Sequence, residues 1–175
     1  MGDVRCRKGL TVNLDAITNT AIDPALSLLP PSLDTPQARI LMLAIGLQES
    51  RFLHRRQLGG PARGFWQFEK GGGVLGVLTH PSSSVLARQV CAARRVDAMS
   101  ATVYAALETD DVLAAAFARL LLWTDPARLP DRDDVGGAWA LYLRTWRPGK
   151  PHPGTWSALH AQALAAQGEA HSHRI

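Results

Sequence analysis

A glutamate at the end of a long apolar segment is the residue of this 175-residue chain best suited to acid–base chemistry. Glu49 follows the run Ala38–Leu47, whose apolar residues predict a buried helix with Glu49 in its last turn. Met42, Ile45 and Glu49 fall on one side of that helix, so Glu49 continues an apolar line. A carboxyl group in such a place is poorly solvated, and its pKa should rise. A raised pKa suits a general acid that works near neutral pH.

A loop rich in glycine and aromatic residues follows the glutamate. It reads Gly59-Gly60-Pro61-Ala62-Arg63-Gly64-Phe65-Trp66-Gln67. Glycine lets the backbone approach another group closely. The two aromatic residues are expected to offer a stacking surface, and Gln67 offers an amide. These are the features of a wall that holds a ligand beside an acid.

The two segments resemble motifs of soluble lytic transglycosylases, which are members of the lysozyme-like superfamily. Glu49-Ser50-x-Phe52 resembles their Glu-Ser-x-aromatic motif, and Ala62-x-Gly64-x-x-Gln67 resembles their Gly-Ala-x-Gly-Leu-Met-Gln motif. The separation of 18 positions between Glu49 and Gln67 is also the one expected in that family. The resemblance is specific over this stretch and weaker over the rest of the chain.

The resemblance implies a role for each matched position. Glu49 would protonate the glycosidic oxygen of peptidoglycan. The residues implied to bind the sugar are Ser50, Gly64, Phe65, Trp66 and Gln67. Phe65-Trp66 stands where the family has Leu-Met, which predicts a larger and more aromatic wall.

A third motif of the family, Ala-Tyr-Asn-Ala-Gly, has a partial counterpart around Tyr142. The resemblance implies that Tyr142 lies beside the acid and assists it. Leu143 stands where the family has asparagine, and no glycine follows. The alternative is a core helix that uses Trp139, Tyr142 and Trp146 at helical spacing.

A single acid suits a transglycosylase, in which a hydroxyl of the substrate attacks and one glutamate first donates and then accepts a proton. Inverting and retaining glycosidases instead need two carboxylates across the bond. The sequence shows no second carboxylate close to Glu49. Asp125, Asp133 and Asp134 remain open as partners that folding could bring near.

The elements that must position these residues are predicted to be helical throughout. The pattern of apolar residues indicates about seven helices on one core, an all-α lysozyme-like domain, and it allows a small β-hairpin near Gly71 to Val77. We expect an N-terminal arm with short helices over residues 1–33, the helical domain over 34–167 and a flexible tail over 168–175. The predicted caps of three helices are Asp34, Asp133 and Thr155.

Composition narrows the class of protein without choosing a function. A hydrophobic content of 46% with 19% charged residues is ordinary for a globular chain. No apolar run predicts a membrane span, and the basic start Met1–Lys8 lacks the apolar region of a signal peptide. Cys6, Cys91 and the six histidines show no ligand spacing, so no metal or other cofactor is expected. The net charge of +4 suggests an anionic neighbour.

The sequence therefore predicts a peptidoglycan-cleaving lytic transglycosylase or muramidase that acts on the glycan strand. It has the features of a bacteriophage product made in the host cytoplasm, either an endolysin or a wall-degrading part of the virion. The competing class is a phage tail accessory or head–tail adaptor protein assembled in a ring, whose basic loops face a portal or DNA. In that class the lysozyme-like fold has only vestigial or auxiliary wall-degrading activity. A third interpretation is a helical binding module with no enzymatic role. For Glu49 itself, the alternative to catalysis is a surface ion pair with Arg51, Arg55 or Arg56.

Overall fold

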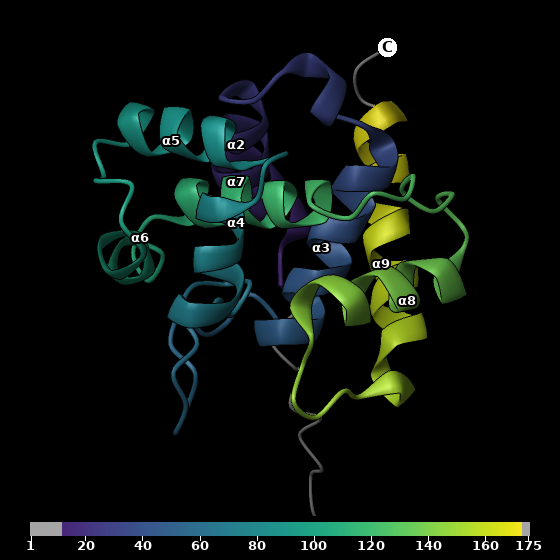
Figure 1. Cartoon of the computed structure of the whole chain (residues 1–175). Coiled ribbons are helices and arrows are strands. Elements are labelled where there is room, and N and C mark those ends of the chain that lie inside the picture. Colours follow the sequence, from purple (N-terminus) through teal and green to yellow (C-terminus); the bar gives the residue numbers. More distant parts are fainter. Residues whose placement is uncertain (1–11, 173–175) are drawn as a thin grey trace, which may run out of the picture.

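The computed structural model describes residues 12–172 and is helical, with no strand in that range (Figure 1). The predicted all-α class is confirmed. Predictions that concern residues 1–11, including Cys6, and residues 173–175, including His173, lie outside the described residues. Among the described helices, none is both long enough and apolar enough to cross a lipid bilayer.

Most helices follow one another closely, and the two longer connections are residues 51–69 and 124–134. Their bounds are α1 Leu14–Ile17, a π-helical turn Thr18–Ile22, α2 Asp23–Ser27, a 3₁₀ turn Pro31–Leu33, α3 Pro36–Ser50, a π-helical turn Lys70–Val74, α4 Leu75–Thr79, α5 Ser84–Ala93, α6 Ser100–Ala106, α7 Asp111–Trp123, α8 Val135–Trp146 and α9 Pro153–Ser172. The β-hairpin expected near Gly71 to Val77 is wrong. Val74, Val77 and Leu78 are buried at helical spacing, so this segment folds into a helix against the core.

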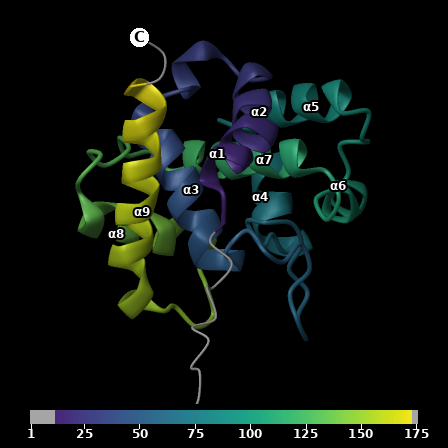
Figure 2. The ribbon, with the colours of Figure 1, turned by 180° about the vertical axis from the view of Figure 1, so that it is seen from behind.

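Two apolar helices form the centre of the molecule. The residues from Ile40 to Leu47 of α3 and from Leu113 to Leu122 of α7 are all buried. A helix that is apolar nearly all round must be enclosed by others. The long helix α9 lies beside α3, as both views of the ribbon show (Figures 1 and 2). The core helix α3 is thus held rigidly from its first turn to the turn that carries Glu49.

The N-terminal segment packs on the chain's own body. Leu14, Ile22 and Leu26 are buried in the same apolar core as α3 and α7. Arg39 of α3 reinforces this contact, because its guanidinium pairs with Asp23 at 2.5 Å and with Asp34 at 2.6 Å. The described part of the predicted arm is therefore one layer of the single core.

The predicted helix caps are each displaced by a short distance along the chain. Thr35 caps α3, since its hydroxyl oxygen accepts the Ala38 N–H at 3.2 Å, while Asp34 is engaged by Arg39. Asp134, one residue after the predicted Asp133, caps α8. These shifts leave the helices where the apolar pattern placed them.

The last helix is longer than predicted at both ends. It begins at Pro153, before the predicted cap Thr155, and continues to Ser172. The Thr155 hydroxyl instead donates to the side-chain oxygen of Gln48 at 3.0 Å. Residues 168–172 of the predicted tail continue this helix, and residues 173–175 are not described. The contact with Gln48 ties the start of α9 to the turn of α3 that carries the acid.

Candidate active site

Glu49 lies in the last turn of α3, and its side chain is half-buried. The hydroxyl of Tyr142, from α8, donates a hydrogen bond to Glu49 Oε1 at 2.6 Å. Burial raises the pKa of Glu49 from its ordinary 4.5 to about 7, and the bond from Tyr142 opposes that rise only in part. Two residues 93 positions apart thus form one acidic group poised near neutral pH.

The chain reverses sharply after the acid. Arg51 and Phe52 both adopt left-handed backbone conformations, with φ of 56° and 53°. The ring of Phe52 then folds back against Gly46, where an added Cβ would lie 2.1 Å from the ring. A glycine at position 46 is therefore required for this reversal, which ends α3 directly behind Glu49.

Ser50 is buried and serves the loop, not a ligand. Its hydroxyl donates to the carbonyl oxygen of Phe65 at 2.6 Å, and its oxygen accepts the Phe52 N–H at 3.1 Å. The implied role of Ser50 in binding the sugar is not supported, because the side chain is 6% exposed and fully engaged. The residue instead fixes the glycine-containing loop at a set distance from the neighbouring Glu49.

The residues matched to the family's second motif form a tight turn. Arg63 and Phe68 exchange two backbone hydrogen bonds, of 2.9 and 2.8 Å, which close the turn from Gly64 to Gln67. Gly64 has φ of +75°, and an added Cβ would lie 2.7 Å from the Leu107 carbonyl oxygen. The Gln67 side-chain amide donates to the Gly64 carbonyl at 2.9 Å. Glycine and glutamine at these positions thus shape the turn itself.

The aromatic wall expected from Phe65 and Trp66 is wrong. Their side chains are 3% and 0% exposed, and each ring packs edge-on against Phe52 at 5.5 Å. The indole N–H of Trp66 donates to the Met42 carbonyl of α3 at 2.8 Å. Both rings enter the core because the tight turn points them back toward the apolar surface of α3. These exposed fractions cover the whole residues, and the two carbonyl oxygens accept hydrogen bonds from Ser50 and Trp146, so neither residue presents a surface to a ligand.

Tyr142 belongs to both of the alternatives that the sequence left open. Its ring lies in the core, stacked on Trp156 at 5.4 Å and next to Trp139 at 5.3 Å, while its hydroxyl reaches the acid. The indole N–H of Trp146 donates to the Trp66 carbonyl at 2.9 Å and links α8 to the turn. Sequence reasoning missed Trp156, whose only signal was an aromatic residue near the start of the last helix.

The arginines that follow Glu49 pair with other acids. Arg55 binds Asp111 at 2.7 Å, and Arg56 binds Glu108 at 3.1 Å. The interpretation of Glu49 as the surface ion-pair partner of these two residues is therefore wrong. Glu49 instead accepts a hydrogen bond from the neutral hydroxyl of Tyr142.

The aspartates considered as second carboxylates have other roles. Asp125 pairs with Arg144 at 3.0 Å, and this contact lowers the pKa of Asp125. Asp134 caps α8 by accepting the Gly137 N–H at 2.8 Å. Asp133 borders a surface cavity of about 440 Å³, and neither this cavity nor a second one of about 280 Å³ is lined by Glu49. Within residues 12–172, no group of three or more histidine, cysteine or acidic side chains is arranged to hold a metal.

No family model, curated protein or solved structure matches this chain. A functional proposal therefore depends on the geometry around Glu49 and on the motif resemblance.

Proposed function

We propose that the protein cleaves the β-1,4 bond between N-acetylmuramic acid and N-acetylglucosamine in peptidoglycan, as a lytic transglycosylase or muramidase with Glu49 as acid and base. The observation that carries the proposal is the Tyr142–Glu49 pair. A half-buried carboxyl group with a pKa of about 7 is protonated and deprotonated in comparable amounts at neutral pH. Such a group can donate a proton and then take one back.

The orientation of the carboxyl group favours one oxygen as the donor. Because the Tyr142 hydroxyl donates to Oε1, the transferable proton of the acid form resides on Oε2. Oε2 protonates the glycosidic oxygen as its bond to C1 of the muramic acid breaks. The hydrogen bond from Tyr142 then stabilises the carboxylate that this transfer leaves behind.

The second half of the reaction restores the acid. The carboxylate removes the proton from the 6-hydroxyl of the same muramic acid while that oxygen forms a bond to C1. The product is a 1,6-anhydro sugar, no water is consumed, and Glu49 regains its proton. If water attacks C1 instead, the same proton transfers give a hydrolase and a reducing end.

Gln67, the partly exposed residue of the Gly64–Gln67 turn, is the proposed contact for the sugar. The turn places the side chain of Gln67, and Ser50 keeps the turn fixed relative to the acid. A ligand held against a rigid turn presents its bond to the acid in one geometry, which lowers the entropic cost of reaction.

Mass spectrometry of purified peptidoglycan after incubation with the protein tests the proposal. We expect soluble fragments with 1,6-anhydro ends, and fragments with reducing ends would identify a hydrolase. Glu49→Gln should abolish release, whereas Glu69→Gln, at an exposed carboxylate, should leave it unchanged. If the wild-type protein releases no fragment, the enzymatic proposal is wrong, and a ring-sized particle in solution would then favour the adaptor class.

A further inference from the structure

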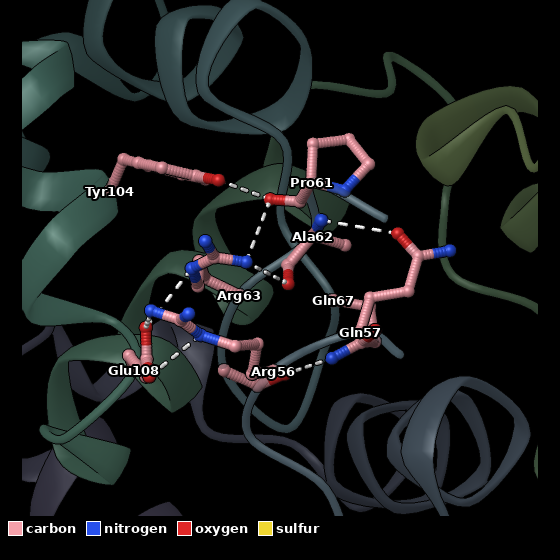
Figure 3. Close-up of polar contacts among 9 residues, drawn as sticks. Arg56, Gln57, Pro61, Ala62, Arg63, Gln67, Tyr104 and Glu108 are labelled. Atoms are coloured by element: carbon pink, nitrogen blue, oxygen red, sulfur yellow. Dashed lines mark hydrogen bonds and ion pairs between the residues drawn. The ribbon is translucent and has the colours of Figure 1, made fainter. Parts of the chain in front are cut away.

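We propose that Glu108 is a positioning residue, which holds the Gly64–Gln67 turn against Glu49 through the side chain of Arg63. The effect on catalysis rests on the proposed function, whereas the effect on the turn does not. Glu108 follows the end of α6 and was not singled out by the sequence. Figure 3 shows the contacts that converge on it from the loop.

Arg63 is the residue through which the turn can be held. Its backbone exchanges both hydrogen bonds with Phe68 and so closes the turn. Its guanidinium Nε lies 3.0 Å from Glu108, and the Arg63 side chain is only 17% exposed (Figure 3). A partly buried charged pair is screened less by solvent than an exposed one. The position of Arg63, and with it the turn, is therefore set by a carboxylate on another element.

The same arginine and a tyrosine from α6 hold the segment that leads into the turn. Arg63 Nη1 donates to the Ala62 carbonyl at 3.2 Å, and the hydroxyl of Tyr104 donates to the carbonyl of Pro61 (Figure 3). The Arg63 guanidinium also lies over the Tyr104 ring, 5.3 Å from its centre. Tyr104 and Glu108 are four residues apart, so they project from the same side of the helix end.

The turn also meets the α6 end directly. Gly64 lies so close to the Leu107 carbonyl that it has no room for a Cβ, and Leu107 immediately precedes Glu108. On its other side the turn is bound to Ser50, the neighbour of Glu49. The turn is thus held between the α6 end and the acid-bearing end of α3. Releasing the α6 side would leave the distance between turn and acid poorly defined.

Arg56 provides a matched control because it binds the same carboxylate at 3.1 Å. Its side chain is 64% exposed, compared with 17% for Arg63. Exposed ion pairs contribute little to stability or geometry. Removing Arg56 therefore takes one charge from Glu108 without releasing the turn.

The test compares Glu108→Ala and Glu108→Gln with Arg56→Ala by hydrogen exchange and by steady-state kinetics on purified, uncrosslinked glycan strands. The reporter amides are those of Phe68 and Gly64, which donate to Arg63 and Arg55, and the amide of Ala138 in α8 reports the rest of the fold. In Glu108→Ala, exchange at both reporters should rise at least about tenfold while Ala138 is unchanged. The kcat should fall about 10- to 100-fold while KM changes by less than about threefold, because the turn is misplaced at the reacting bond.

Glu108→Gln keeps an acceptor for Arg63, so it should retain more of the kcat than Glu108→Ala. Arg56→Ala should match the wild type in both measurements. Three results would overturn the inference. The first is unchanged exchange in Glu108→Ala, the second is raised exchange with an unchanged kcat, and the third is an equal effect of Arg56→Ala. If Glu108→Ala does not fold, the test uses Glu108→Gln alone. The inference is then overturned if Glu108→Gln shows the same exchange and the same kcat as the wild type. If the wild type cleaves no glycan, the proposed function fails, and hydrogen exchange alone decides whether Glu108 holds the turn.

Discussion

Replacing Glu49 with glutamine should make the protein more stable, and only at the pH values where the carboxyl group would be ionised. Glutamine has nearly the same shape, and its amide oxygen can still accept the Tyr142 hydroxyl. The substitution removes the free-energy cost of holding the ionised carboxylate of Glu49 at a half-buried position. A stability gain that depends on pH is therefore a test of the site that does not require any substrate.

The size and sign of this stability difference follow from the pKa of Glu49 in the folded and unfolded chains. Burial raises that pKa from 4.5 to about 7, a difference that corresponds to about 3 kcal/mol. Below pH 4.5 the group is protonated whether the chain is folded or unfolded, so ionisation contributes nothing. Between pH 4.5 and 7 the unfolded chain loses the proton first, and the wild type loses stability relative to the variant. Above pH 7 the difference levels off at about 1–3 kcal/mol, since the side chain is partly exposed to solvent.

Urea denaturation of both proteins at several pH values from 4 to 9 measures this difference. The free energy of unfolding of Glu49→Gln minus that of the wild type should increase from pH 4.5 to 7 and then stay constant. In thermal melts the variant should gain several degrees above pH 7. Glu69→Gln should show no such trend, because Glu69 is exposed. A difference for Glu49→Gln that is flat across the range would refute the claim that this carboxyl group is desolvated.

Three further predictions concern the same site. Release of peptidoglycan fragments should decline as the pH rises above about 7, because Glu49 then loses the proton it must donate, and a pH profile of the initial rate measures this. Tyr142→Phe keeps the stacked ring but removes the hydrogen bond that lowers the pKa of Glu49. The decline in rate should therefore move to higher pH, and the maximal rate should fall about tenfold. A pH profile that does not move would contradict the assigned hydrogen bond. Gly64→Ala should cost about 1–3 kcal/mol in urea denaturation, because it forces a Cβ against the Leu107 carbonyl at positive φ; a cost below about 0.5 kcal/mol would show that the turn is not tightly held.

The acid could be found from the sequence because its position depends on local periodicity. Glu49 continues an apolar line on a helix whose burial is dictated by the residues around it, and the burial found in the structure follows from that pattern. Tyr142 was found through a motif, and helical spacing also explains why its ring is buried. The last helix was predicted to start at the cap Thr155 and to end by residue 167, whereas α9 spans Pro153–Ser172.

The partners around the acid could not be found in the same way. Trp156 reaches Tyr142 because the consecutive helices α8 and α9 pack together. Glu108 reaches Arg63 because the end of α6 packs against the loop that follows α3. Phe65 and Trp66 were expected to face a ligand, since a loop is usually exposed. The direction of their side chains was instead set by the left-handed Gly64 and by the apolar surface of α3, which no local pattern specifies.

The distribution of backbone strain adds an argument for the enzymatic proposal. Within residues 12–172, five residues other than glycine have positive φ. Arg51 and Arg147 directly follow helix ends, where this conformation is common. Arg95 follows the capping residue of α5 in the same way. Phe52 lies in the chain reversal after Glu49, and Gln67 lies in the Gly64–Gln67 turn. Each such residue costs about 1–3 kcal/mol, in addition to the cost of the buried carboxylate. Strained backbone gathered near a desolvated carboxyl group is typical of active sites, which supports the enzymatic proposal over a purely scaffolding role.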